Sequence, residues 1–498
     1  MTPSSCLAAS AILALAAGSP PAGPSCRADG WCWVNPTPQG NGLLDLYASA
    51  PDQAWAVGER GTLIQWDGQR WTLAESGVPE RLRAIDGRGP QDVWAVGDDG
   101  AAIHFDGRSW TSHPLPERRV LRDVWVSPSG VAWTVGPDLV GRWDGQAWRL
   151  EARPDSPLET VWGTSDHDVW VGGGKTLCRW NGTDWSTIPW PSPLASKDVI
   201  QPDPSRIRGV AGDQIAVTFV PEGIESPQEL TAFTWSGEAW QRLPASFSAP
   251  GGIWALSDLW VPQRDDVWLR VAFSRAPVPP YHLRRVNGRW TVLTENTEGL
   301  DGLDMSRLAG ARDDDGWAVG ECGGLAHWNG QRWQMASVNP AVVASTMPDP
   351  KPVHALSLGR ARLSPRLDEL WLEGRWPPGD EEVVPHWVRV DLEKRSVEAA
   401  RAPRGVRSLR GTHRRLFKNR AGDSWALRDI GQEPGAATVV VHAIHGNAQP
   451  PVAFPHLGGA FVDGRGDFWG WGDCGTVITQ RGGSGRASPS PSSLAPQP

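Results

Sequence analysis

Apolar and polar residues alternate in short runs along most of the chain, and Gly, Asp, Asn or Pro ends each run. In the first clear example, four runs cover residues 43–48, 54–57, 62–66 and 71–74. Alternation with a period of two, rich in β-branched and aromatic residues, is typical of half-buried strands. Asp67-Gly68 precedes the fourth run and is a hairpin signal, because glycine adopts positive φ without steric cost. The pattern predicts a four-stranded antiparallel unit.

The unit repeats about every 40 residues, a period typical of β-propellers. Its most regular part, Trp66-Asp67-Gly68-Gln69-Arg70-Trp71, returns as Phe105-Asp106-Gly107-Arg108-Ser109-Trp110 and as Trp143-Asp144-Gly145-Gln146-Ala147-Trp148. A tryptophan in the second strand and another in the outer strand mark most units. We interpret these residues as structural markers of the repeat: Trp55, Trp71, Trp94, Trp110, Trp133, Trp148, Trp170, Trp185, Trp317, Trp333 and Trp469.

Counting second-strand tryptophans, and adding a degenerate unit around residues 215–219, indicates ten units. The eighth and ninth units are divergent, so the range is seven to ten. The tenth lacks its outer strand, whereas residues 29–36 contain an outer strand without three strands before it. We therefore expect an all-β fold with a single β-propeller of about ten four-stranded antiparallel blades, closed by the N-terminal strand pairing into the last blade. Two smaller propellers in tandem are the alternative.

This organisation divides the chain into a leader (1–25), a closing strand (26–42), the propeller (43–480) and a disordered tail rich in Ser, Pro and Gly (481–498). Residues 7–18 form an apolar run that is too short to span a bilayer and fits a secretory signal. We expect export to the periplasm, the outer-membrane surface or the extracellular space, with no transmembrane segment. Cys26 is a candidate for lipid attachment.

Five of the six cysteines follow the leader, and export favours disulfides. If both ends of the chain share the last blade, Cys26 or Cys32 lies near Cys474, and a Cys32–Cys474 bond is expected. No Cys or His spacing is typical of a metal site, so we expect no metal and no cofactor. Asp313-Asp314-Asp315 lacks the spaced acidic residues of a calcium loop, and the histidines are dispersed.

The chain has 31 Trp and 2 Tyr. Its formal net charge of −8 argues against a nucleic-acid partner. One segment inverts this charge, with no acidic residue between Glu398 and Asp423. We predict that its arginines bind an acidic polysaccharide or a lipid head group near the central channel. The alternative is ion pairs with neighbouring blades. The candidate binding residues are Arg401, Arg404, Arg407, Arg410, Arg414 and Arg415.

Loop lengths differ between the two ends of the predicted blades. Turns from inner to second strands and from third to outer strands are mostly short. The other two loop classes are lengthened, at residues 189–205, 221–229, 244–252, 274–280, 337–352, 377–384 and 431–437. In an up-and-down blade these longer loops emerge at one end, and such insertions usually mark the binding face of a repeat protein.

Two segments, Gly30-Trp31-Cys32-Trp33-Val34-Asn35-Pro36 and Asp92-Val93-Trp94-Ala95-Val96-Gly97-Asp98, resemble those of the secreted Trp-rich β-propeller repeat proteins of gliding soil bacteria, the myxobacterial type. The Asp-Gly turns are also similar to the Asp-box of the bacterial neuraminidase repeat and to repeats in photosystem-assembly propellers. They lack the residue that the Asp-box has between Asp and Gly. The resemblance implies a propeller at the cell surface or in the periplasm, in a family whose function is largely unassigned.

We therefore expect a monomeric, non-catalytic extracytoplasmic scaffold whose loop-rich face binds a protein or a polysaccharide. The alternative is a carbohydrate-active hydrolase or lyase with its site at the channel mouth. Such an enzyme would gather carboxylates and arginines there. The Asp-box is a structural turn and implies no sialidase chemistry. A sialidase would also need a tyrosine nucleophile, and the two tyrosines, Tyr47 and Tyr281, both lie in predicted strands.

Overall fold

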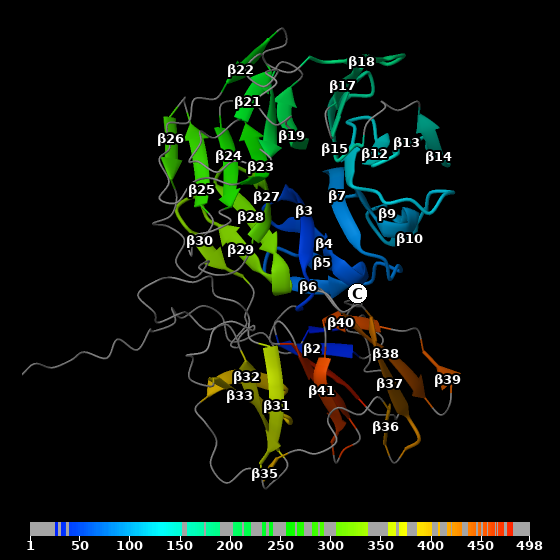
Figure 1. Cartoon of the computed structure of the whole chain (residues 1–498), viewed down its shortest axis with the longest axis vertical. Coiled ribbons are helices and arrows are strands. Elements are labelled where there is room, and N and C mark those ends of the chain that lie inside the picture. The colour runs from blue at the N-terminus through cyan, green and yellow to red at the C-terminus, as the bar shows by residue number, and fades with distance from the viewer. Residues whose placement is uncertain are drawn as a thin grey trace, which may run out of the picture.

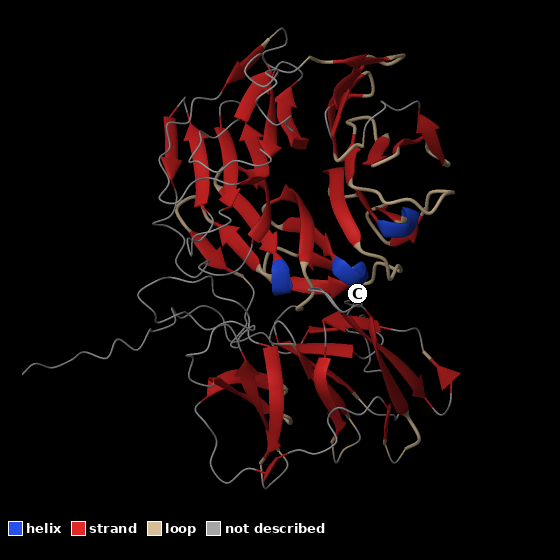
Figure 2. Ribbon diagram, viewed as in Figure 1, coloured by secondary structure: helices blue, strands red, loops and turns tan. Residues whose placement is uncertain are grey.

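The computed structural model shows a chain built almost entirely from β-sheets (Figure 2). It describes residues 25–27, 31–35, 39–151, 157–173, 176–189, 203–211, 214–220, 232–235, 239–242, 255–263, 266–272, 281–286, 289–292, 305–336, 357–364, 368–375, 386–400, 407–408, 416–419, 421–430, 437–444, 447–449, 452–455, 457–463, 465, 467–472 and 476–481. Within these ranges the helical elements are three short 3-10 turns, η1 (Glu59–Gly61), η2 (Asp98–Gly100) and η5 (Glu321–Gly323). No helix there is long and apolar enough to cross a membrane. Apart from residues 25 and 481, the predicted leader and tail lie outside the described residues, as do nearly all of the lengthened loops.

Seven four-stranded antiparallel sheets follow one another along the chain. They are sheet 1 (β3, Leu43–Ala50; β4, Gln53–Gly58; β5, Leu63–Trp66; β6, Trp71–Ala74), sheet 2 (β7, Leu82–Gly89; β8, Asp92–Gly97; β9, Ala102–Phe105; β10, Trp110–Ser112), sheet 3 (β11, Asp123–Val126; β12, Ala132–Gly136; β13, Leu139–Trp143; β14, Trp148–Glu151), sheet 4 (β15, Thr160–Ser165; β16, Asp168–Gly173; β17, Thr176–Trp180; β18, Trp185–Thr187), sheet 5 (β19, Asp203–Ala211; β20, Gln214–Val220; β21, Ala232–Trp235; β22, Trp240–Arg242), sheet 6 (β23, Ala255–Gln263; β24, Asp266–Ala272; β25, Tyr281–Val286; β26, Arg289–Val292) and sheet 7 (β27, Met305–Arg312; β28, Asp315–Gly320; β29, Leu325–Trp328; β30, Trp333–Met335). The four-stranded units are confirmed, including the degenerate one, which is sheet 5.

The predicted Asp-Gly turns join third to outer strands. In sheet 3, Asp144 Oδ1 accepts hydrogen bonds from the backbone N–H groups of Ala147 and Gln146, at 2.8 and 2.9 Å. Gly145 has a φ of 95°, a region that favours glycine. The two backbone bonds, with a third from Arg149, hold the pKa of Asp144 at about 2. The recurring Asp-Gly phrase is therefore a turn that stabilises each hairpin.

Sheets 1 to 7 pack side by side in a circle (Figure 1). The first strand of each sheet lies against the first strand of the next, in the order β3, β7, β11, β15, β19, β23 and β27. β27 then lies against β3 again. The expectation of a single ring through about ten units is not met, because the packing order returns to sheet 1 after sheet 7.

Tryptophans explain why sheet 7 packs on sheet 1. The second-strand tryptophan of one sheet packs against the third and outer strands of the next, as Trp55 does 5.1 Å from Trp110, ring centroid to ring centroid. Trp317 of sheet 7 makes the same contact with sheet 1, at 4.8 Å from Trp66 and 5.0 Å from Trp71. Large aromatic rings supply much apolar area and prefer tilted or edge-to-face contacts. The repeated phrase thus specifies the contact between neighbouring sheets.

Three further sheets lie outside this circle (Figure 1). They are sheet 8 (β31, Ser357–Leu363; β32, Glu369–Arg375; β33, His386–Asp391; β34, Ser396–Ala400; β35, Arg407–Ser408), sheet 9 (β36, Leu416–Lys418; β37, Ser424–Ile430; β38, Ala437–Ile444; β39, Asn447–Ala448; β40, Val452–Pro455) and sheet 10 (β41, Leu457–Val462; β42, Phe468–Gly472; β43, Val477–Gln480; β2, Trp31–Asn35; β1, Ser25–Cys26). The antiparallel pairing of β2 with β43 confirms that the N-terminal strand completes the last unit. It does so in sheet 10, away from the contact between sheets 7 and 1.

Sheet 10 lies between the other two, since β41 contacts both β31 and β36. One core cluster joins sheets 8 and 10 around Trp469 and Trp471, and another joins sheets 9 and 10 around Trp425 and Phe468. Leu73 of sheet 1 packs against the second cluster. This contact connects the three-sheet part to the circle.

The predicted Cys32–Cys474 disulfide is wrong. β1 and β2 form a hairpin whose register places Cys26 opposite Cys32, and these two residues are disulfide-bonded. Cys474 lies outside the described residues. Cys322 in η5 is also disulfide-bonded, and in the described part of the chain the free thiol is Cys178, which is buried.

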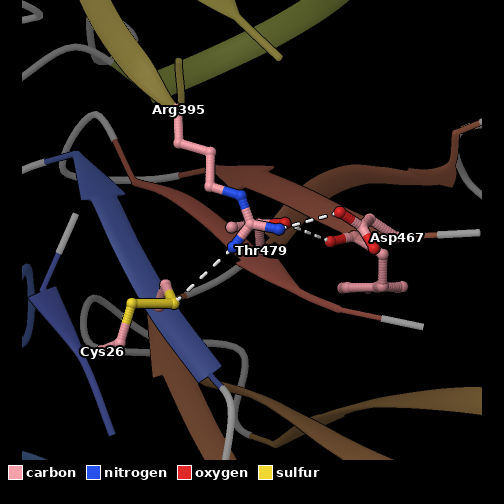
Figure 3. The surroundings of a disulfide bond; sticks show 6 residues. Cys26, Arg395, Asp467 and Thr479 are labelled. Carbon is pink, nitrogen blue, oxygen red and sulfur yellow. Dashed lines mark hydrogen bonds and ion pairs between the residues drawn. A yellow bond between two sulfur atoms is a disulfide. The ribbon is translucent and has the colours of Figure 1, made fainter. Parts of the chain in front are cut away.

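Figure 3 shows Arg395 between the Cys26–Cys32 disulfide and Asp467. Arg395 follows β33 in sheet 8, and its Nη1 donates towards Cys32 Sγ at 3.9 Å. Its Nη2 donates to Asp467 Oδ2 of sheet 10 at 2.8 Å. The N-terminal hairpin is therefore held by side chains as well as by its pairing with β43.

Candidate functional site

The repeat uses many of its charged and histidine side chains for its own packing. In sheet 2, Asp92 Oδ1 lies 2.7 Å from His104 Nε2, and the His104 ring stacks on Trp94 with 4.5 Å between centroids. In sheet 6, Arg284 replaces the histidine: it bonds Asp266 and lies over the second-strand tryptophan. Because the arrangement recurs from sheet to sheet, it is a structural device.

The Asp313-Asp314-Asp315 segment divides its carboxylates among different partners. These partners are Gln263 and Arg284 for Asp313, Arg312 for Asp314, and His327 for Asp315. Across the described ranges, no three His, Cys, Asp or Glu side chains are grouped to hold a metal ion.

Aspartates link the first strands of neighbouring sheets around the axis of the circle. Asp45 Oδ2 accepts a hydrogen bond from Ile85 N at 3.0 Å, and Asp86 Oδ2 accepts one from Val126 N at 2.8 Å. Asp123 extends the series into sheet 4. A first strand is a sheet edge, so some of its N–H groups lack a partner within the sheet. The aspartates satisfy such groups from the preceding sheet and hold the first strands together.

We define the axial layer as the seven first-strand residues that pair with the tryptophan position of the second strand. These residues are Tyr47, Asp86, Trp125, Trp162, Arg208, Trp260 and Ala309. Aromatic members lie against a glycine of the next first strand: a β-carbon on Gly87 would lie 2.8 Å from Tyr47 Cε1, and one on Gly163 would lie 2.8 Å from Trp125 Cη2. Asp86 and Arg208 are the charged members of the layer.

Arg208 reaches from sheet 5 past sheet 4 to sheet 3. Its Nη1 donates to Ile207 O at 2.8 Å and lies 3.4 Å from Asp123 Oδ2. The same carboxylate oxygen accepts hydrogen bonds from Thr160 Oγ1 at 2.9 Å and Val161 N at 3.1 Å. Asp123 is 1% exposed, whereas the Arg208 side chain is 25% exposed. The pair therefore joins three sheets, and the Arg208 side chain remains partly exposed.

Asp86 is half-buried on β7. Burial raises the pKa of its carboxyl group to about 7, and the negative charge of Asp123 adds to this. The hydrogen bond from Val126 and the positive charge of Arg208 act in the opposite direction but do not cancel the effect of burial. Burial and the charges of Asp86 and Asp92 likewise raise the pKa of the Tyr47 phenol. The layer thus contains one carboxyl group that titrates near neutral pH.

Replacing Asp86 by asparagine is expected to stabilise the protein at alkaline pH. The folded-state pKa of about 7 lies above the ordinary value of 3.8, so the stability that Asp86 contributes is complete below 3.8 and is lost as pH rises through 7. The carbonyl oxygen of the asparagine side chain would still accept the Val126 N–H bond. We expect the thermal midpoint of Asp86→Asn to exceed that of the unaltered protein at pH 8, with a smaller difference at pH 5. A difference that does not grow with pH would contradict this assignment.

The sequence interpretation missed Asp86 and Arg208. Each axial residue lies eight positions before its second-strand anchor, as Asp86 does before Trp94 and Arg208 before Ala216. Aligning the repeats on the second-strand tryptophan position therefore identifies Asp86 and Arg208 as the charged residues of this layer. Sheet 5, whose anchor is alanine, is the sheet whose axial residue is arginine.

The predicted arginine site is placed only in part. Arg407 lies in β35, which pairs with β31 at the edge of sheet 8, whereas the prediction put it near the central channel. Sheet 8 is outside the seven-sheet circle, so this strand does not line its axis. Arg401, Arg404, Arg410, Arg414 and Arg415 lie outside the described residues.

Comparisons with known proteins find similar solved structures at low sequence identity. No protein-family model and no curated protein matches the sequence. Similar solved structures include YCF48 bound to D1 peptide (17% identity, TM-score 0.45, covering 62% of this chain and 99% of that one) and YCF48 from Cyanidioschyzon merolae (16%, 0.42, 60% and 98%). Another is the extracellular domain of the one-component system BT4673 from B. thetaiotaomicron (11%, 0.44, 89% and 57%). These neighbours are β-propellers, and the likeness is one of fold.

Proposed function

We propose that this chain is a non-catalytic binding scaffold that acts outside the cytoplasm. In this proposal sheets 1 to 7 form a complete propeller, which binds a protein or glycan partner at the axis. The observation that carries the proposal is the pair of charged residues in the axial layer. Asp86 and Arg208 occupy positions where other sheets place an aromatic residue or alanine, and both retain solvent exposure. Charged residues that depart from a packing repeat are typical of a binding site.

Two further observations support this proposal. The Cys26–Cys32 disulfide is typical of an oxidising, extracytoplasmic compartment. At one end of sheet 2, Asp98 N donates to Arg81 O at 2.9 Å and Gly100 N donates to Arg119 O at 2.6 Å. These bonds bring a second-to-third turn beside the segments that lead into first strands. The two loop classes that the sequence lengthens elsewhere therefore share an end, which we propose as the entrance for the partner.

Binding without turnover is the expected behaviour of the full chain. On arrays of glycans and peptides, a scaffold should retain one ligand class saturably. Incubation with each retained polysaccharide should release no reducing ends or unsaturated products. Release of such products, lost in Arg208→Gln, would identify a hydrolase or lyase and contradict the proposal.

The basic segment is proposed as a second contact, for an acidic polysaccharide or lipid head group. Its charge is opposite to that of the whole chain, which favours attraction of polyanions. The full chain should bind heparin or alginate resin and elute with salt. The double variant Arg407→Glu, Arg410→Glu should elute much earlier. Unchanged retention would show that this segment is not the contact.

A further inference from the structure

We propose that the axial layer binds an organic monocation, an ammonium or guanidinium group, at the carboxylate of Asp86. This inference rests on the proposed function, because it names the group that a partner presents to the axis. Two carboxylates and one guanidinium are brought together here. Arg208 lies 3.4 Å from Asp123, and in the described part of the chain no cation forms an ion pair with Asp86. The positive charge of Arg208 acts on Asp86 only from a distance, so Asp86 is the carboxylate with which a cationic ligand can pair.

Burial distinguishes the two carboxylates. Asp123 is almost fully buried and accepts bonds from Thr160, Val161 and Arg208. Asp86 is half-buried, and the bond from Val126 engages only its Oδ2. An ionised carboxylate that is partly removed from water and lacks a counter-ion is costly. A cationic ligand removes that cost and so gains more at Asp86 than at an exposed aspartate.

The surroundings favour an organic cation over a metal ion. Calcium and magnesium require several oxygen ligands, whereas Asp86 is one carboxylate and the described residues contain no grouped metal ligands. Arg208 already bonds Asp123 and Ile207 O, which makes an anionic ligand less favourable.

Binding should depend on pH. The charged and titratable groups of other first strands that act on Asp86, or on which Asp86 acts, are Tyr47, Asp123 and Arg208. The raised pKa of Tyr47 keeps its phenol protonated over the neutral range. Burial raises the pKa of Asp86 to about 7, so Asp86 changes charge in this range. Because a cation binds the ionised carboxylate, its affinity should be about tenfold weaker at pH 6 than at pH 8.

Titration calorimetry of the full chain with acetyl-Gly-Lys-Gly-amide tests this inference. The matched peptide with norleucine in place of lysine removes only the charge, and cadaverine supplies a free amine. We expect the lysine peptide to bind at pH 8 at least tenfold more tightly than the norleucine peptide. Cadaverine binding as tightly as the peptide would also support a cation site and would identify a free amine as sufficient.

Two variants provide the controls. Asp86→Asn, which is expected to fold at least as stably, should reduce affinity for the lysine peptide at least tenfold and abolish its pH dependence. Asp52→Asn removes an exposed carboxylate of sheet 1 and should change neither. Equal binding of the two peptides, or unchanged affinity in Asp86→Asn, would overturn the inference. Array ligands that still bind Asp86→Asn normally would show that the scaffold function stands without the cation site.

Discussion

Replacing Trp317 by alanine is expected to lower the free energy of unfolding by about 3–5 kcal/mol. Trp317 is 1% exposed, and its ring contacts Trp66 and Trp71 of sheet 1. Truncation would remove one of the largest buried side chains and leave a cavity where sheets 7 and 1 meet. Urea unfolding, followed by far-ultraviolet circular dichroism, measures the change.

The matched control is Leu150→Ala. Leu150 is a large apolar residue of sheet 3 but is 51% exposed, so its truncation should change stability by no more than about 0.5 kcal/mol. If Trp317→Ala were as mild as Leu150→Ala, the contact between sheets 7 and 1 would not stabilise the fold.

Replacing Asp123 by alanine should cost a similar amount, about 3–5 kcal/mol. The change would leave the Arg208 guanidinium without its carboxylate and would remove the acceptor of Thr160 Oγ1 and Val161 N. Unpaired buried charges and hydrogen-bond donors are among the most destabilising defects. Asp52→Ala is the control, because Asp52 is exposed and its removal should change stability by no more than about 0.5 kcal/mol. A cost for Asp123→Ala within the range of this control would mean that Arg208 and Asp123 do not hold sheets 3 to 5 together.

Local features of the fold were readable from the sequence. The Asp-Gly turns depend on side-chain bonds to residues two and three positions away, as at Asp144, and strand alternation is equally local. Each four-stranded unit, including the degenerate one, could therefore be predicted. The pairing of β2 with β43 was predictable for another reason: an incomplete last unit and an unaccompanied N-terminal strand complement each other.

The number of sheets in the circle depends on contacts between distant residues, which a periodic sequence does not specify. Ten repeats suggest a ring of ten sheets, but the ring closes where Trp317 packs on another sheet. Its contacts are Trp66 and Trp71 of sheet 1, and sheets 8 and 9 pack instead on sheet 10. The predicted boundary between leader and closing strand, after residue 25, divides β1. The sequence therefore did not indicate the β1–β2 hairpin, in which Cys26 lies opposite Cys32.

The axial layer was missed for a similar reason. Asp86 and Arg208 are ordinary residues in isolation and become notable only when seven first strands are placed around one axis. The arginine-rich segment, by contrast, is conspicuous in composition, yet β35 joins the edge of sheet 8. Charge density along the chain is thus a poorer guide to the candidate site than departure from the repeat.

A double-mutant cycle between Trp71 and Trp317 in the full chain tests the seven-sheet circle most directly. The rings are 5.0 Å apart and perpendicular, so the two alanine substitutions should be non-additive by about 0.5–3 kcal/mol. Trp71 and Trp133, which lie in sheets 1 and 3, provide the control and should be additive. Additivity of Trp71 and Trp317 within about 0.5 kcal/mol would contradict the circle, because sheet 7 would then not pack on sheet 1.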